Sequence, residues 1–137
     1  MNQTYLAIAA GAVLLVMVFG TSFLLRRKPK KLSQDYYYDK WQELQKLCKD
    51  KSTWPLAIID ADKLLDDVLK KLRYKGKTMG ERLVAAQRDI KDNDGVWFGH
   101  KLRNRLVHEN NVKLTERDVK EALIGLRAGL KDLGALK

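Results

Sequence analysis

Cysteine and histidine are scarce in this chain, and their scarcity excludes several kinds of site. Cys48 is the single cysteine among 137 residues, and the only histidines are His100 and His108. One cysteine cannot form an internal disulfide or a multi-cysteine metal centre, and so few ligands argue against a zinc site. We also find no glycine-rich phosphate loop, no HExxH motif, no Ser/His/Asp triad and no internal repeat. We therefore expect neither a metal nor a cofactor.

Acidic residues are absent from the first part of the chain, where basic residues gather. No acid precedes Asp35, whereas residues 26–31, RRKPKK, supply five of the 27 basic residues. The rest of the chain holds 22 basic and 17 acidic residues, so its excess of five positive charges is spread out. Such a mild excess falls short of the dense basic stripe of a dedicated DNA-binding protein.

The N-terminal segment has no charged residue over a long stretch. Residues 5–25, YLAIAAGAVLLVMVFGTSFLL, are 21 uncharged residues, enough to cross about 30 Å of hydrocarbon as a helix. We predict a transmembrane anchor over 1–25, a basic linker over 26–32 and one folded domain over 33–137. The cations after the apolar run place that domain on the cytoplasmic side of a single-pass protein of the cell (inner) membrane.

A cleaved signal peptide is the competing interpretation of the same segment. It fits less well, because MNQT carries no basic residue and the apolar run exceeds the usual core of about 7–15 residues. The small residues Gly20, Thr21 and Ser22 are compatible with a cleavage site, so the signal peptide stays an open alternative. In the linker, Pro29 favours a short extended connection, and the cations are expected to attract anionic lipid headgroups.

From Ser33 onward the apolar periodicity is helical, with no convincing strand. The first expected helix is capped by Ser33 and runs to about residue 50, and the second has Pro55 in its first turn and runs to Gly76. A third helix follows Thr78 and reaches about Asp92. A fourth covers 96–109, and a fifth follows Thr115 and ends at Gly134. The fold class is therefore all-α, a transmembrane helix followed by a compact four- to five-helix bundle.

Four aspartates accompany the broad apolar stripe of the expected central helix over 55–75. They are Asp60, Asp62, Asp66 and Asp67. Paired carboxylates can bind metals or transfer protons, but on an amphipathic helix they more often form a solvated face. Lys63, Lys70 and Lys71 are spaced to pair with them, which favours the solvated face.

The helix over 96–109 has an unusual second face. At about 100° per residue, Phe98, Leu102 and Leu106 form its core stripe. The opposite sector combines histidines and cations with apolar side chains and includes Val96, Trp97, His100, Arg103, Asn104, Val107 and His108. A solvated face would not need such apolar residues, so we expect a second contact there. Asn104 and His108 are also spaced for a side-chain hydrogen bond.

The segment RNRLVH resembles the R-x4–6-H motif of the HEPN (higher eukaryotes and prokaryotes nucleotide-binding) superfamily, in its form with a polar residue after the arginine. The matching positions are Arg103, Asn104 and His108, with four residues between the arginine and the histidine. Members are small all-α bundles with the motif on a helix followed by a final helix, as expected here over 33–137. RNRLVHE in particular resembles bacterial small-protein versions.

The resemblance implies a homodimer in which two motif helices line a shared cleft. Val96, Trp97 and Val107 would then lie at the dimer interface. Active members are metal-independent endoribonucleases, so His108 would act as general base or acid at a ribose 2′-hydroxyl of single-stranded RNA. Arg103 would stabilise charge on the phosphate, Asn104 would orient either group, and His100, Lys101 and Arg105 would assist RNA binding. No protein partner can be named.

Two other interpretations stay open. Many family members retain the fold and the motif but serve as non-catalytic dimers that bind nucleotide or RNA or hold partner proteins, here at the inner membrane face. Without the resemblance, the chain is an anchored helical adaptor, since a histidine near a helix C-terminus is also stabilised by the helix dipole alone.

Overall fold

The computed structural model describes residues 2–24 and 29–137, and over these residues the protein is all-helical. Six α-helices and two short 3₁₀ helices appear, and no strand is present in the described part of the chain. The predicted fold class is therefore confirmed. The predicted end of the anchor at residue 25 and the start of the linker at 26 lie outside the described residues.

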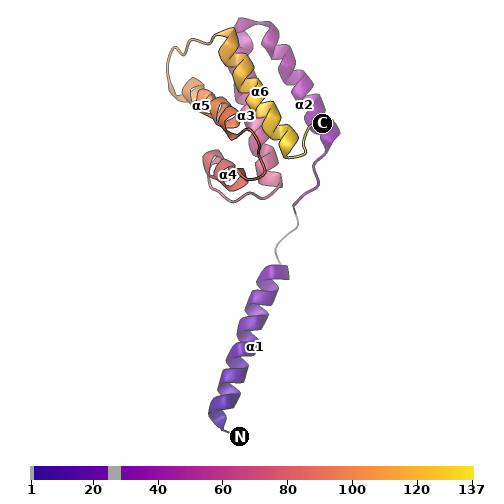
Figure 1. The fold of residues 1–137 in the computed structure, drawn as a ribbon, viewed down its shortest axis with the longest axis vertical. Coiled ribbons are helices and arrows are strands. Elements are labelled where there is room, and N and C mark those ends of the chain that lie inside the picture. The colour runs from indigo at the N-terminus through magenta and orange to yellow at the C-terminus, as the bar shows by residue number, and fades with distance from the viewer. Residues whose placement is uncertain (1, 25–28) are drawn as a thin grey trace.

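Helix α1, Gln3–Leu24, carries the uncharged segment. Its residues 3–21 are long and apolar enough to cross a membrane, and none of that segment is buried inside the protein. Figure 1 shows α1 standing apart from the other helices. A signal sequence has the same length and composition, so these properties fit either one.

Helix α2, Gln34–Lys46, begins as the sequence predicts. The Ser33 hydroxyl accepts a hydrogen bond from the backbone N–H of Tyr36, which satisfies a free donor of the first turn. Tyr37, Trp41 and Leu44 are buried along one face. Two 3₁₀ turns, η1 (Leu47–Lys49) and η2 (Lys51–Thr53), then connect α2 to α3, so the helix is shorter than expected.

Helix α3, Trp54–Lys71, is the centre of the bundle and contacts α2, α4, α5 and α6. It has Pro55 in its first turn, as expected, and ends five residues before Gly76. The backbone N–H of Tyr74 donates to the carbonyl of Leu69, and that of Arg73 donates to Lys70. This pattern ends the helix with Arg73 in the left-handed region at φ 64°.

Helix α4, Met79–Ala86, is capped by Thr78 as predicted but ends before Asp92. The side chain of Asn93 donates to the carbonyls of Gln87 and Ile90, closing a turn where a continuous helix is expected. Helix α5, Asn93–His108, accordingly starts three residues earlier than the periodicity indicates. Asp92 is its cap, accepting from the backbone N–H of Gly95 at 2.9 Å.

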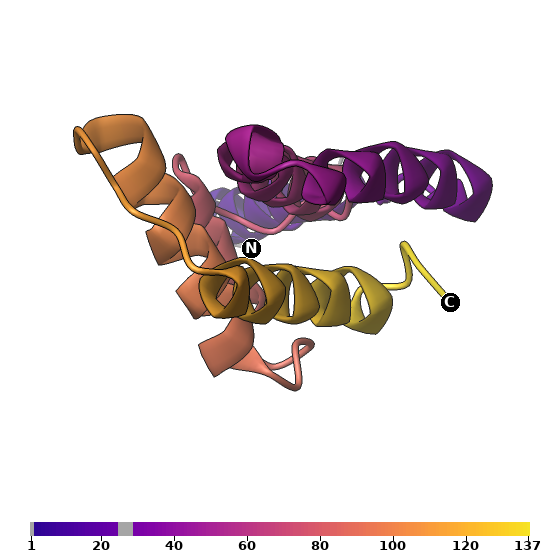
Figure 2. The same ribbon diagram turned by 90° about the horizontal axis from the view of Figure 1, so that it is seen from above.

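Helix α6, Glu116–Asp132, has a full capping box in which Thr115 and Asp118 satisfy each other's backbone N–H groups. It packs closely against α5, and Figure 2 shows the two helices crossing obliquely. A Cβ on Gly125 would overlap the carbonyl of Gly95, and one on Gly99 would overlap Leu126. Glycines therefore set the close approach that fixes α5 in the bundle.

Candidate functional site

A buried carboxylate of α3 holds two side chains of α5. Asp62 is 1% exposed, and its Oδ1 lies 2.9 Å from Nδ1 of His100. Its Oδ2 lies 3.3 Å from Nε of Arg103. The expectation that Asp62 belongs to a solvated face is wrong, because the side chain points into the contact between α3 and α5. The expected pairs of Lys70 with Asp66 and of Lys71 with Asp67 are confirmed.

Asn104 joins the same cluster. Its Oδ1 accepts a hydrogen bond from Nη1 of Arg103 at 2.9 Å, and its Nδ2 lies 3.4 Å from Nε2 of His100. The expected hydrogen bond from Asn104 to His108 is therefore replaced by contacts one turn earlier. Asn104 can donate to Nε2 only if the His100 proton is on Nδ1, where it points at Asp62. The carboxylate and the amide thus fix one orientation of the imidazole.

The charge balance of the cluster depends on Asp62. Burial raises the pKa of the Asp62 carboxyl above its usual range, while the hydrogen bond to His100 and the charge of Arg103 partly counteract this. A carboxylate this deep in the protein is stabilised only by paired hydrogen-bond donors and cations. His100 and Arg103 supply this compensation for Asp62, so their contacts with the carboxylate restrict the positions of both side chains.

A cavity of about 480 Å³ opens beside the cluster, between α5 and the start of α4. It is lined by Asp66, Thr78, Met79, Gly80, Trp97, His100, Lys101, Arg103 and Asn104. The Trp97 ring meets the His100 ring edge-on, with centroids 5.7 Å apart, and Nζ of Lys101 lies 6.0 Å from the Trp97 centroid. An aromatic wall with an imidazole, a lysine and an arginine suits a small anionic group such as a phosphate.

Asp66, the acid of that cavity, is already paired. The guanidinium of Arg82 donates to it through Nε at 2.8 Å and Nη2 at 3.0 Å, and Lys70 lies 2.8 Å away. Arg82 is itself 7% exposed and also donates to the carbonyl of Gly76. The two cations neutralise this carboxylate, so it opposes an anionic ligand only weakly. Sequence reasoning assigned no role to Arg82.

His108 lies away from this cluster. It is the last residue of α5, is exposed, and has no hydrogen-bond or ion-pair partner among the described residues. Arg103 faces Asp62, about 140° around the helix axis from His108. One protomer therefore does not bring these two motif residues together. Lys101 is exposed at the cavity rim, and Arg105 is exposed and pairs with Glu109 at 3.3 Å.

The three residues expected at a dimer interface differ in exposure. Val96 is 1% exposed and packs in the core against Gly129, so its assignment to a dimer surface is wrong. The Val96 side chain meets helix α6 of the same chain, whereas His100 and Arg103 of the same sector contact Asp62 of α3. Trp97 is half-buried against the core, and Val107 is 50% exposed. Of the three, Val107 has the largest exposed fraction.

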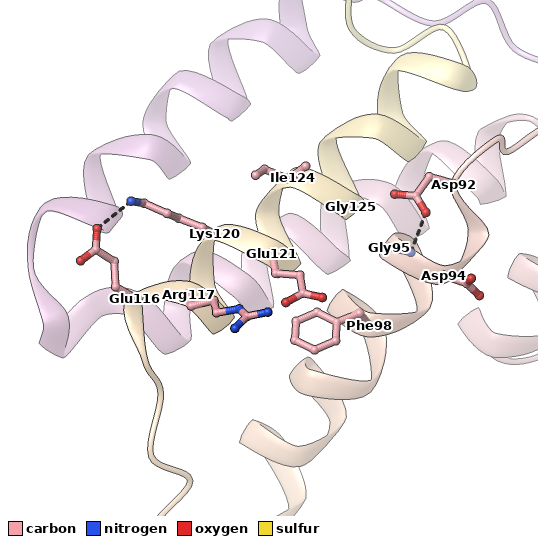
Figure 3. A pocket seen from close by; sticks show the side chains of 10 residues that line it. All are labelled: Asp92, Asp94, Gly95, Phe98, Glu116, Arg117, Lys120, Glu121, Ile124 and Gly125. Atoms are coloured by element: carbon pink, nitrogen blue, oxygen red, sulfur yellow. Dashed lines mark hydrogen bonds and ion pairs between the residues drawn. The ribbon is translucent and has the colours of Figure 1, made fainter.

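A larger cavity, of about 900 Å³, lies elsewhere and contains none of the predicted site residues. It lies between α5 and α6, and Figure 3 shows its lining side chains, which include Asp94, Phe98, Arg117 and Glu121. Asp92 there caps α5, and Glu116 pairs with Lys120 at 2.8 Å. Half of its six charged side chains are thus engaged in structural contacts. Among the described residues, no group of three or more His, Cys, Asp or Glu side chains is placed to hold a metal ion.

Asp62 is the member of the cluster that sequence reasoning missed, although a signal for it exists. Plotted at about 100° per residue, Asp62 falls within about 60° of Ile58, Leu65 and Leu69, which is inside the apolar stripe. An acid in that position must be compensated by partners from another helix.

Comparison of the chain with known proteins identifies no relative. No family model, no curated protein and no solved structure matches it.

Proposed function

We propose that this protein is a membrane-anchored, HEPN-like ribonuclease that cleaves single-stranded RNA without a metal ion, in a cleft between two copies. The observation that carries the proposal is Arg103, which is ion-paired with Asp62 and hydrogen-bonded to Asn104 at the edge of a polar cavity. A fixed guanidinium can stabilise the charge that develops on a phosphate without reorganising during the reaction. α1 would anchor the protein in the inner membrane with residues 33–137 in the cytoplasm.

In the proposed reaction, the imidazole of His108 removes the proton of a ribose 2′-hydroxyl. The 2′-oxygen attacks the adjacent phosphorus, the bond from phosphorus to O5′ breaks, and a 2′,3′-cyclic phosphate forms. The protonated imidazole of His108 then gives this proton to the leaving 5′-oxygen. Since Arg103 and His108 lie on different sides of one helix, we assign them to opposite copies of the dimer. His100, Lys101 and Arg105 would assist RNA binding.

The test uses the full chain in detergent, incubated with mixed single-stranded RNA in EDTA. We expect cleavage to fall by about 10²–10⁴-fold in His108→Ala and comparably in Arg103→Ala, with products that end in a cyclic phosphate. Arg127→Ala is the matched control, because Arg127 is an exposed cation of α6 with no ion pair among the described residues. Equal cleavage by all variants, or none by the wild type, would contradict the proposal.

A mixing experiment tests the shared cleft. If each site combines Arg103 of one copy with His108 of the other, mixing the two inactive variants restores about a quarter of the activity. Half of the dimers are then mixed, and each mixed dimer retains one intact site of two. No recovery after exchange of subunits would place both residues in one copy or in no site at all.

A second candidate is a non-catalytic HEPN-like dimer that binds nucleotide or RNA, or holds partner proteins at the inner membrane face. The contact of Arg103 with Asp62 favours it, because that carboxylate reduces the charge available to a phosphate. In this case the wild type binds a labelled single-stranded RNA without cleaving it. Binding would weaken in Arg103→Ala and remain in His108→Ala.

A further inference from the structure

A second basic segment follows α3, at one end of the bundle. Residues 70–77, KKLRYKGK, carry five cations, and no acid occurs between Asp67 and Glu81. The first two lysines pair with aspartates one turn earlier on α3. The remaining three are exposed and form no ion pair within the described residues: Arg73, Lys75 and Lys77. Uncompensated cations at this density attract a polyanionic surface.

The segment that leads in from α1 is held against this same end of the bundle. The backbone N–H of Lys30 donates to the carbonyl of Lys71 at 3.2 Å. Leu32 packs against the core, and Nε2 of Gln34 donates to the carbonyl of Gly134 at 3.2 Å. Lys30 and Lys31 are exposed there. The chain thus enters the domain at the end that carries the second basic segment.

The distance from α1 to this end of the bundle is limited by covalent geometry. Five residues lie between Leu24, the end of α1, and Lys30. Even fully extended, the six steps from Leu24 to Lys30 span at most about 22 Å. The headgroup layer occupies roughly the first 6 Å beyond the hydrocarbon. Residues 70–77 are therefore confined to the neighbourhood of any membrane that α1 crosses.

Arg73 provides independent support. It has φ 64°, a conformation that glycine adopts far more readily than a residue with a side chain. A cation at a position that favours glycine departs from the local preference, and such departures concentrate at functional positions. Position 73 thus carries a cation although glycine would fit its backbone conformation better.

We propose that the end of the bundle formed by Lys30, Lys31, Arg73, Lys75 and Lys77 docks on the headgroups of anionic phospholipids. This rests on α1 being the membrane anchor, but not on RNA cleavage. RNA phosphates offer similar charges, but the attachment of this face to the anchor places it next to lipid. We call these five residues the basic end.

Docking in this way would orient the C-terminal end of α5. α3 has 18 residues and is about 27 Å long, and its N-terminal end lies farthest from the basic end. Leu106 of α5 and Leu114 pack in the cluster with Ile58 near that far end. The C-terminal end of α5, with His108, therefore faces away from the bilayer, where a long polymer has access to it.

The experiment uses the full chain in nanodiscs of neutral phosphatidylcholine alone or mixed with anionic phosphatidylglycerol. Exposed lysines are acetylated with a neutral water-soluble reagent, and the rates are read by mass spectrometry. With the anionic lipid we expect Lys75 to react on the order of tenfold more slowly. Lys46, Lys49 and Lys113, which are exposed lysines outside the basic end, should react equally in both discs. Equal reactivity of Lys75 in both discs would overturn the proposal.

A charge variant separates docking from mere proximity to the bilayer. In Arg73→Gln/Lys77→Gln the anchor and the reporter Lys75 are retained, so the protection of Lys75 should be lost. The matched control, Lys49→Gln/Lys113→Gln, should retain it, and circular dichroism checks the fold of both. Protection that persists in the Arg73/Lys77 variant would contradict the proposal. Protection of Lys75 by single-stranded RNA but not by anionic lipid would also overturn it, and would assign the basic end to RNA.

Discussion

The carboxylate of Asp62 and the imidazole of His100 lie 2.9 Å apart in the contact between α3 and α5, and both side chains are buried. This pair connects the central helix of the bundle to the helix that carries the RNRLVH motif. Arg103 contacts Asp62 and Asn104 contacts His100, so the four side chains form one connected polar cluster. Changes at Asp62 should therefore affect both stability and the position of Arg103.

Replacing Asp62 by asparagine should change how stability depends on pH. Burial raises the pKa of Asp62, so its protonated form contributes stability that is fully present below the pKa of the unfolded chain. That contribution is lost as the pH rises through the higher pKa of the folded state. As the pH rises above about 4, the usual pKa of an aspartate in an unfolded chain, the wild type should lose free energy of unfolding relative to Asp62→Asn.

Urea unfolding at several pH values, followed by the fluorescence of Trp41, Trp54 and Trp97, measures this difference. All three tryptophans belong to the domain and none to α1. A pH-independent difference between the two proteins would refute the assignment, as would a gain by the wild type with rising pH.

Tyr37→Phe should lower the free energy of unfolding by about 1.5–3 kcal/mol, the usual range for a hydrogen bond to a charged group. The Tyr37 hydroxyl donates to Oδ2 of Asp67 at 2.7 Å, and burial together with this hydrogen bond raises the pKa of Tyr37 to about 12. The control is Tyr38→Phe, since Tyr38 is 58% exposed. Equal loss in the two variants would show that the hydrogen bond is not responsible.

Gly125→Ala should destabilise the bundle by at least about 2 kcal/mol, because the new methyl group would overlap the backbone of Gly95 and force α5 and α6 apart. Gly80→Ala is the matched control. A Cβ at Gly80 would lie 3.6 Å from the Trp97 ring, an ordinary contact. Thermal unfolding should show little change or a small gain there, and a normal midpoint for Gly125→Ala would disprove the close helix contact.

Arg73→Gly should stabilise the domain by about 0.5–1 kcal/mol, since glycine adopts the left-handed conformation at the end of α3 without the steric cost of a side chain. Chemical unfolding in detergent measures the change. Asn111 also has a positive φ, of 60°, but asparagine tolerates this region better, so Asn111→Gly should gain less. A loss of stability in Arg73→Gly would show that the arginine side chain itself stabilises the fold.

Much of the fold follows from local signals in the sequence. Ser33, Thr78 and Thr115 cap the helices that they were expected to cap, because a side-chain oxygen next to a free N–H is a local interaction. The predicted start of α5 at residue 96 is three residues too late, since a glycine such as Gly95 favours a turn in isolation but serves a helix contact in the bundle. Tertiary packing, which periodicity does not describe, decides such positions.

The candidate site was only partly predictable. The motif helix and its second polar face were recognised from the residues of α5 alone. The role of Asp62 was not, because its partners are 38 and 41 positions later in the chain. Val96 was assigned to a dimer surface because a helical wheel cannot tell a neighbouring helix of the same chain from a second copy.

If α1 anchors the protein, as proposed above, the hydrogen bond between Lys30 and Lys71 also restricts how two copies can pair on one membrane. It then holds the same end of every bundle close to its own α1, so neighbouring copies share one up-and-down direction. A symmetric pair must then have its two-fold axis along the membrane normal. Only the flanks of the bundles can meet under that symmetry, and an end-to-end pair would require the two anchors to enter opposite membranes.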